Sequence, residues 1–321
     1  MLVKVQNLKK LFPVRKGFFS RGVDYVHAVD EVSFEIARGR IFGLVGESGC
    51  GKTTCGKLLV RLLDSTSGSI YLEDRDIAGL EGKELKEFRK NVQMIFQDPY
   101  ESLNPRFTIF DTIAEPLVIQ NIGTFEERVE AVTKALNVVD LKPPEDFLFR
   151  FPHELSGGQR QRVAIARALV VEPKFIVADE PVSMLDASIG AGIMNLMLEL
   201  RDKFNLTYVF ITHDLAVGRY ICDSIAVMYL GKIVEMAPKE EIINDPKHPY
   251  TEALLSAVPV PDPRVKKERV LLKGEVPSPL SPPTGCRFHT RCPYKMEICS
   301  REEPKLKEIK KGHLVACHLH T

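Results

Sequence analysis

The sequence has no excess of charge of either sign. Its 321 residues include 44 Lys plus Arg and 43 Asp plus Glu, which gives a formal net charge of +1 at pH 7. Proteins that bind nucleic acid non-specifically depend on clustered positive charge, so this balance argues against nucleic acid as a partner.

Long hydrophobic runs are also missing. A bilayer span needs roughly 18 to 20 consecutive apolar residues, and no stretch of the chain comes near that length. The opening segment MLVKVQNLKK lacks the apolar core of a secretory signal. We therefore expect a cytosolic protein that meets a membrane only through partners.

What remains is an ordinary globular composition, with 44% hydrophobic and 27% charged residues. A chain of this length exceeds one usual hydrophobic core, so we expect one large domain with an appendage. Apolar runs alternate with helical patterns, which favours an α/β fold with a largely parallel sheet. Residues 98–170 lack strong strand signals and indicate a helical insert. The expected strands cover residues 29–36, 40–47, 175–180 and 206–214, with a helix over 188–203.

A phosphate-binding loop lies between an expected strand and an expected helix. The segment GESGCGKT fits G-x-x-x-x-G-K-T in the strand–loop–helix context that makes this motif specific. Its glycines let backbone N–H groups surround a polyphosphate, and the helix N-terminus adds its positive end. Lys52 is expected to reach the β- and γ-phosphates, and the Thr53 hydroxyl is expected to bind Mg²⁺. The predicted nucleotide-binding residues of this segment are Gly46, Glu47, Ser48, Gly49, Cys50, Gly51, Lys52, Thr53 and Thr54.

Two carboxylates end the apolar strand FIVADE. Asp179 and Glu180 come at the carboxyl edge of a parallel sheet, where such sheets bind ligands. Asp179 is expected to support Mg²⁺, and Glu180 to orient and polarise an attacking water. His213, at the end of the strand YVFIT, is a candidate to contact the γ-phosphate and fix the geometry of that water, although a lone His at a strand end is more often a plain surface residue.

A second anion-binding helix start, LSGGQ at residues 155–159, has no catalytic acids of its own. The ordered set GESGCGKTT, Gln97 in QMIFQDP, LSGGQ, FIVADE, SMLDAS and His213 resembles the ATP-binding cassette family. The resemblance implies a P-loop cassette with an antiparallel β subdomain and a helical subdomain. It also implies that two cassettes pair head to tail, each LSGGQ helix capping the ATP of the opposite subunit.

The same resemblance assigns further roles. Gln97 would reach Mg²⁺ and the water, and with Thr53 and Asp179 it forms the predicted magnesium set. SMLDAS, in which Met184 replaces the commoner Ala, would run along the subunit interface. The predicted catalytic residues are Lys52, Gln97, Glu180 and His213. The residues predicted to serve the partner's ATP are Leu155, Ser156, Gly157, Gly158, Gln159 and Asp186.

An aromatic residue upstream of the loop is expected to stack on adenine, because stacking needs only a π-face. Phe12 is the best match by position. The stretch that follows it is longer than usual in the family, so Phe19 or Tyr25 could take its place.

Two segments, QMIFQDPYESLNPRFTI and NDPKHPYTEALLSAVP, resemble the ATPase subunits of oligopeptide and dipeptide importers. The resemblance implies ATP and Mg²⁺ as cofactors and a peripheral position at the cytoplasmic face of the membrane. The implied partners are a second, commonly non-identical cassette, two membrane permeases and, indirectly, an extracytoplasmic substrate-binding protein. The implied domains are a nucleotide-binding domain over 1–236, with a helical subdomain over about 98–170, and an extension over 237–321. His248-Pro249-Tyr250 is interpreted as a packing element of the extension.

Four of the seven cysteines, Cys286, Cys292, Cys299 and Cys317, lie near the end of the chain. Disulfides are disfavoured in a reducing cytosol. Zinc would accept four thiolates but usually comes with C-x₂-C pairs, which are missing here. A [4Fe–4S] cluster also uses four Cys around a larger cofactor. This tail resembles iron–sulfur members of the importer group, so the cluster is the preferred prediction, with zinc or no metal as alternatives.

Seven prolines between residues 259 and 283 predict an extended linker before this tail. Because such a linker would separate the two parts, changes in the tail are expected to leave ATP affinity nearly unchanged.

Two other classes of function stay open at this point. A soluble cassette ATPase of DNA repair or translation would usually carry coiled-coil arms or two fused cassettes, and neither is visible in the sequence. A metal or redox regulator that binds ATP without turnover would not need Glu180 and His213.

Overall fold

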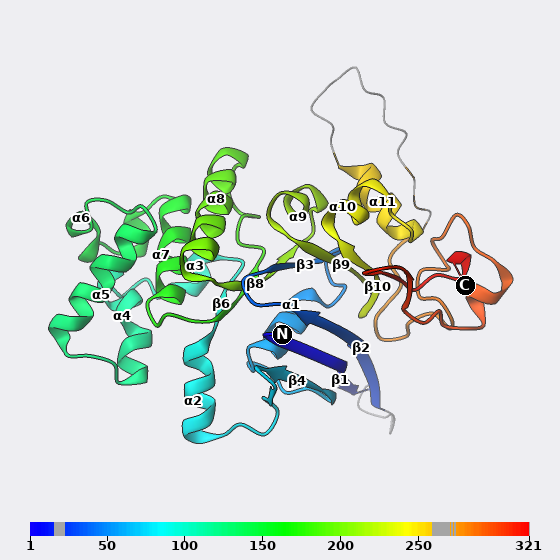
Figure 1. Cartoon of the computed structure of the whole chain (residues 1–321), viewed down its shortest axis with the longest axis horizontal. Helices are drawn as coiled ribbons and strands as arrows, with labels where there is room; N and C mark the ends of the chain where they lie inside the picture. The colour runs from blue at the N-terminus through cyan, green and yellow to red at the C-terminus, as the bar shows by residue number, and fades with distance from the viewer. Residues whose placement is uncertain (16–22, 259–269, 271, 273, 321) are drawn as a thin grey trace, which may run out of the picture. The chain divides into compact units, whose positions relative to one another are not determined.

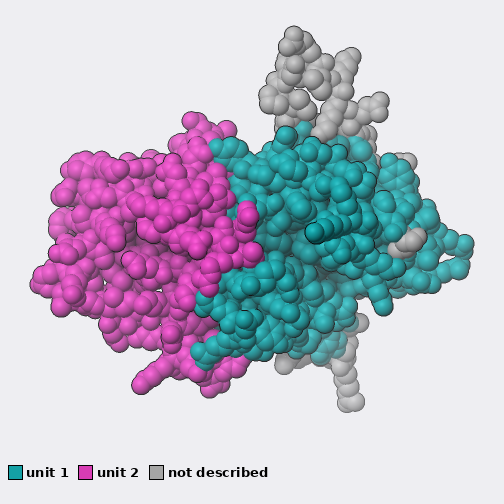
Figure 2. Space-filling model, in the orientation of Figure 1, with its two compact units in different colours: residues 1–36, 41–78, 212–321 teal, residues 37–40, 79–211 magenta. Residues whose placement is uncertain are grey.

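The computed structural model describes residues 1–15, 23–258, 270, 272 and 274–320. It divides into two compact units, which Figure 2 colours separately. Unit 1 contains residues 1–36, 41–78 and 212–321, and unit 2 contains residues 37–40 and 79–211. In the part of the chain that the structure describes, no helix combines the length and the apolar character needed to cross a membrane.

Unit 1 contains an antiparallel sheet with the strand order β2-β1-β4-β5, as the family resemblance implies. Its longest pair, β1 and β2, extends from Val3 opposite Ile36 to Arg15 opposite Val23, with shifts of register between Val5 and Leu11. Toward its end, β2 buries every second side chain, as the alternating pattern of VDEVSFEI predicts. The strands are β1 (Val3–Arg15), β2 (Val23–Ile36), β4 (Ser67–Leu72) and β5 (Arg75–Asp76).

The second sheet of unit 1 follows the order β11-β12-β10-β9-β3. At its parallel end β3 is buried along its whole length beside β9, so the prediction of a short buried strand over 40–47 is confirmed. The strands are β3 (Ile41–Val45), β9 (Ser224–Tyr229), β10 (Lys232–Pro238), β11 (Lys307–Lys310) and β12 (His313–Val315). The helices of unit 1 are α1 (Lys52–Leu59), α9 (Leu215–Ile221), α10 (Lys239–Asn244), α11 (Pro249–Ala257), η2 (Glu297–Ser300) and η3 (His318–His320).

Unit 2 combines three parallel strands, in the order β8-β7-β6, with a group of helices. All side chains of β7 are buried, which is typical of a parallel strand covered on both faces. The strands are β6 (Val92–Ile95), β7 (Phe175–Asp179) and β8 (Thr207–Thr212). The helices are α2 (Gly82–Asn91), α3 (Pro99–Ser102), α4 (Ile109–Gln120), α5 (Phe125–Val138), α6 (Glu145–Leu148), η1 (Pro152–Glu154), α7 (Gly157–Leu169) and α8 (Ala187–Phe204).

The helical insert is confirmed. Between residues 98 and 170, all of which the structure describes, every regular element is a helix. Capping boxes begin α4 at Thr108 and α5 at Thr124, because each threonine accepts from a backbone N–H three residues on and the acidic side chain there reaches back. Both helices pack on α7, with which they form the green cluster of Figure 1.

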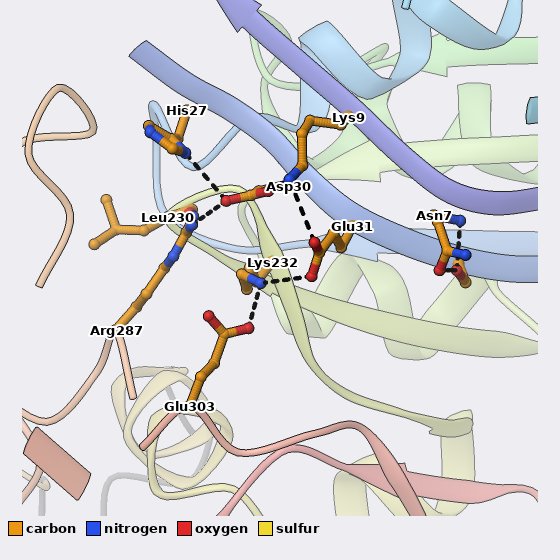
Figure 3. Close-up of polar contacts among 10 residues, drawn as sticks. Asn7, Lys9, His27, Asp30, Glu31, Leu230, Lys232, Arg287 and Glu303 are labelled. Carbon is orange, nitrogen blue, oxygen red and sulfur yellow. Dashed lines mark hydrogen bonds and ion pairs between the residues drawn. The ribbon is translucent and has the colours of Figure 1, made fainter. Parts of the chain in front are cut away.

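A buried ion pair joins the C-terminal extension to β2 (Figure 3). The Arg287 guanidinium donates to the Asp30 carboxylate and to the carbonyl oxygen of Leu230. Lys9 Nζ lies 3.0 Å from Asp30 Oδ1, and His27 Nδ1 lies 3.1 Å from Asp30 Oδ2. Burial alone would raise the pKa of the Asp30 carboxyl, but the hydrogen bonds from Lys9 and His27 and the charge of Arg287 lower it to about 2.

The predicted separation of the tail from the cassette is wrong. β12 pairs with β10, and the Phe288 ring lies 5.2 Å from the Tyr229 ring and 5.4 Å from the Tyr250 ring, measured between centroids. The carbonyl oxygen of Pro279, inside the proline-rich segment, accepts a hydrogen bond of 3.0 Å from the His27 N–H. Burial of the Phe288 ring and the pairing of β12 with β10 outweigh the extended preference of the prolines, and the Arg287–Asp30 pair fixes where the tail docks. Residues 259–269, 271 and 273 of the predicted linker lie outside the described residues.

The packing role predicted for His248-Pro249-Tyr250 is confirmed. His248 and Tyr250 are buried, and His248 Nδ1 accepts the N–H of Tyr250 at 3.1 Å to cap α11.

Arg287→Met is expected to lower the free energy of unfolding by about 2 to 3 kcal/mol, because it leaves a buried carboxylate with fewer partners. The expected loss is smaller than for a buried carboxylate left without any partner, because Lys9 and His27 still contact Asp30. The free energies of unfolding of the variant and the wild type are measured by urea denaturation. The matched control is Arg301→Met, which breaks an ion pair whose arginine side chain is 72% exposed, and little change is expected there. Equal losses in the two variants would contradict the role of the buried pair.

Candidate nucleotide-binding site

The phosphate loop runs from the end of β3 into α1 and passes very close to two neighbouring backbones. A Cβ on Gly51, whose φ is 107°, would lie 2.0 Å from the carbonyl oxygen of Ala28. A Cβ on Gly46 would lie 2.2 Å from the carbonyl oxygen of Met228. Both positions therefore require glycine, which explains two of the glycines in the motif.

The start of α1 is suited to an anion. No acidic residue lies in its first turn, and Gly51 makes no side-chain cap, so the positive end of the helix is not neutralised locally. Lys52 is buried, and its Nζ donates to the carbonyl oxygens of Gly46 at 2.7 Å and Glu47 at 3.0 Å. The ammonium thus lies within the curve of the loop, where the motif predicts a polyphosphate.

The other predicted residues of the loop differ in exposure. Ser48 and Gly49 are exposed, whereas Thr53 and Thr54 are half-buried in the first turn of α1. Cys50 is buried, and burial raises the pKa of its thiol. A buried neutral thiol behaves as a small apolar side chain, so the Cys50 side chain packs inside the loop.

Two residues of the extension contact the loop, and sequence reasoning assigned neither of them to the site. The Glu47 N–H donates to the Tyr250 hydroxyl at 2.8 Å. Arg291 donates from Nη1 and Nη2 to the two carboxylate oxygens of Glu47, at 2.8 and 3.1 Å. These contacts join residues 203 and 244 positions apart, so no local pattern could have revealed them.

In unit 2 the structure brings Gln97 and Glu180 together. Asp179, the buried last residue of β7, is followed by Glu180 in a left-handed backbone conformation with φ 46°. That conformation ends the strand, and the Glu180 N–H donates to the carbonyl oxygen of Ile211 at 3.0 Å. Gln97 Nε2 donates to Glu180 Oε2 at 3.2 Å. The amide therefore orients one oxygen of the carboxylate that the sequence predicts as the general base.

The LSGGQ segment forms the first turn of α7. Ser156 is the N-cap, with Oγ accepting the Gln159 N–H at 3.3 Å and its own N–H donating to Gln159 Oε1 at 2.9 Å. Gly158 is buried, and a Cβ there would lie 2.6 Å from Cγ2 of Ile189 on α8. Leu155 is buried, and Asp186 is the exposed N-cap residue of α8. The motif thus presents an exposed serine at a helix start whose glycine packs against α8.

The remaining predicted site residues belong to unit 1. His213 is exposed and directly follows β8. Phe12 lies on β1 opposite Val26, with Lys10 Nζ 5.1 Å from its ring centroid. Tyr25 is 46% exposed, and Phe19 lies outside the described residues. The choice of Phe12 as the adenine platform stays a prediction.

The four tail cysteines are free thiols, and the Cys286 N–H donates to the carbonyl oxygen of Cys299 at 2.8 Å. Burial, together with the neighbouring thiols of Cys299, Cys317 and Cys292, raises the pKa of Cys286 to about 12. Among the described residues, however, no group of three or more His, Cys, Asp or Glu side chains lies as the ligands of a metal ion do. The structure therefore gives no support to the predicted metal, and the choice between a cluster, zinc and no metal stays a prediction.

Two family models match the chain. The model described as ABC transporter covers residues 29–183, and the model described as the C-terminal region of oligopeptide/dipeptide transporters covers residues 234–299. The oligopeptide transport ATP-binding protein AppF of Bacillus subtilis is 52% identical over 323 residues, covering 100% of this chain and 98% of that protein. A putative peptide import ATP-binding protein of Brucella ovis is 50% identical over 316 residues, covering 98% of this chain and 97% of that protein.

A solved structure agrees with the fold. The dimeric post-hydrolysis state of the ATP-binding cassette MJ0796 bound to ADP and Pi is 31% identical with a TM-score of 0.65, covering 74% of this chain and 99% of that one. The first family model spans the phosphate loop, the LSGGQ helix start and the acidic end of β7. The chain therefore belongs to the ABC transporter family, among the ATP-binding proteins that carry the oligopeptide/dipeptide transporter C-terminal region.

Proposed function

We propose that this chain is the ATP-hydrolysing subunit of a peptide importer. The observation that carries the proposal is the contact of Gln97 with Glu180 directly after the buried Asp179, in a chain whose phosphate loop encloses Lys52. A carboxylate held in this way can orient and polarise a water for attack on a phosphate. The names of relatives that cover nearly the whole chain support peptides as the solute. They favour transport over a repair or translation ATPase and over a regulator without turnover.

Each predicted residue has a separate task in this proposal. The loop from Gly46 to Thr54 binds the phosphates, Phe12 stacks on adenine, and His213 fixes the water held by Glu180. The hydroxyl of Thr53, the amide of Gln97 and the carboxylate of Asp179 are hard oxygen donors of the kind that Mg²⁺ accepts. Mg²⁺, when bound there, would neutralise charge on the phosphates. Transfer of the phosphoryl group then depends on positioning and charge stabilisation more than on covalent chemistry.

The exposed helix start at Ser156 supports a second cassette as partner. ATP bound at one loop would contact Ser156 and Gly158 of the opposite subunit, with Asp186 beside that interface. Closure of the pair on two ATP molecules would drive two membrane permeases to alternate access, and hydrolysis would reset them. In this scheme residues 1–236 are the nucleotide-binding domain, residues 98–170 its helical subdomain and residues 237–321 the extension, at the cytoplasmic face of the membrane.

We further propose that Cys286, Cys292, Cys299 and Cys317 hold a [4Fe–4S] cluster. What supports it is that the extension carries four free thiols and that a cluster, being larger than one ion, accepts ligands spaced more widely. When bound, the cluster would link four points of the extension through iron–thiolate bonds.

Glu180→Gln tests the general base. The amide cannot accept the proton of water, so hydrolysis by the assembled transporter should fall by about a hundredfold or more while ATP binding persists. Lys52→Ala is the contrasting variant, because loss of the charge inside the loop should abolish ATP binding. Steady-state ATPase rates and equilibrium ATP binding measure the two effects. Unchanged turnover in Glu180→Gln would overturn the assignment.

Ser156→Arg tests the action in trans. The loop supplies the chain's own ATP contacts, so the isolated variant should bind ATP as the wild type does. Mixed with a wild-type partner cassette, it should silence hydrolysis at the partner's loop, because a bulky cation replaces the serine at the helix start. His153→Arg, which adds the same charge at an exposed position three residues earlier, should leave the partner active. A large loss of ATP affinity in isolated Ser156→Arg would instead mean that Ser156 contacts its own nucleotide.

Anaerobic purification tests the cluster. The full-length chain should absorb broadly near about 400 nm and carry about four iron atoms. Cys317→Ser should lose this iron, whereas His318→Ala, at the adjacent residue, should retain it. Colourless wild-type protein without iron would contradict the proposal.

A further inference from the structure

The second residue of the phosphate loop is held from the C-terminal extension. Arg291 contacts both carboxylate oxygens of Glu47 in a two-pronged pair, at 2.8 and 3.1 Å. The Arg291 side chain is only 9% exposed and that of Glu47 is 28% exposed. A bidentate pair with little exposure is stronger and more directional than a surface ion pair.

Every polar group of Glu47 has a partner. Its N–H donates to the Tyr250 hydroxyl at 2.8 Å, its carbonyl oxygen accepts from Lys52 Nζ at 3.0 Å, and its carboxylate is bound by Arg291. Two of these three partners come from residues beyond β10. The N–H and the carboxylate of Glu47 are therefore held from outside the motif, whereas its carbonyl oxygen is held from within it, by Lys52 and by the N–H of Cys50 at 3.3 Å.

The charge of Glu47 makes this pairing important. A carboxylate at the second position of a phosphate loop adds a negative charge beside the site where a polyphosphate binds. Like charges repel each other at close range, so an unpaired Glu47 carboxylate would lower the affinity of the loop for ATP. The guanidinium of Arg291 cancels that charge.

Arg291 is itself well positioned. Its N–H donates to the carbonyl oxygen of Phe288 at 3.0 Å, and Nη1 also lies 3.5 Å from the hydroxyl of Tyr229. Phe288 is buried against Tyr229 and Tyr250, next to the Arg287–Asp30 pair. The extension thus presents the guanidinium from a packed base, not from a solvated side chain.

We propose that Arg291 is a positioning residue of the nucleotide site, which holds Glu47 and through it the phosphate loop in the conformation that binds ATP. The inference rests on the proposed function only in that the loop binds ATP. Through the contact of Arg291 with Glu47, the extension would contribute to the affinity for ATP.

The test compares Arg291→Met with Arg301→Met in the full chain, using equilibrium binding of ATP and of ADP. Both changes remove an arginine from the extension, but Arg301 pairs with the exposed Glu297. Arg291→Met should weaken binding of both nucleotides by about five- to tenfold, in the range of coupling between sites, and Arg301→Met should leave it unchanged. Arg291→Lys keeps the charge without the two-pronged geometry and should give an intermediate affinity.

A second pair of variants separates positioning from a general loss of structure. If Arg291 acts through Glu47, adding Arg291→Met to Glu47→Gln should change ATP affinity much less than it does in the wild type, because no charge is left to pair. An equal loss in both backgrounds, or wild-type affinity in Arg291→Met, would overturn the inference. Failure of the wild-type chain to bind ATP would overturn the proposed function and the inference together.

Discussion

The close approach of two backbones to the phosphate loop is the constraint on which the site depends. The carbonyl oxygens of Ala28 on β2 and Met228 on β9 leave no space for a Cβ at Gly51 or Gly46. The turn after β9 continues this contact, since Gly231 donates to the carbonyl oxygen of Cys50 and accepts from the N–H of Asp30, both at 2.8 Å. The loop is thus shaped by its surroundings as much as by its own glycines, and any element that fixes β2 or β9 also fixes the loop.

The LSGGQ helix start combines a glycine that packs within unit 2 with a serine that stays exposed. Gly158 lets α7 approach Ile189 of α8, and this is a packing requirement within unit 2. Ser156 caps the helix and stays exposed, so its hydroxyl lies at the surface beside the helix N-terminus. A single anion-binding helix start would suffice for a chain that only held its own ATP. A second anion-binding helix start is useful only if it contacts a phosphate that is bound to another molecule. This requirement favours a paired cassette.

The sequence predicts those parts of the site that are specified by short continuous segments. The loop, the strand that ends in Asp179 and the capped start of α7 each fit within about ten residues, and each is found where the pattern indicates. The family resemblance assigns Gln97 and Glu180 to the same water, but it does not predict their direct contact, which joins residues 83 positions apart. The docking of the extension could not be foreseen, since the proline content indicates an extended segment. Its cause is burial of Phe288, and the Arg287–Asp30 pair, whose members lie 257 positions apart, fixes its position.

The short segment CRFHTRC places each docking arginine beside a cysteine. Arg287, which pairs with Asp30, follows Cys286, and Arg291, which pairs with Glu47, precedes Cys292. Any group that binds these two thiols therefore restrains the backbone of both arginines. Because coupling between two binding sites is reciprocal, a group that strengthens ATP binding through Arg291 must itself be held more tightly when ATP is bound. The extension is therefore not an appendage to the ATP site: Arg291, the neighbour of Cys292 in the chain, contacts Glu47 of the phosphate loop, and Phe288 packs against Tyr229 and Tyr250.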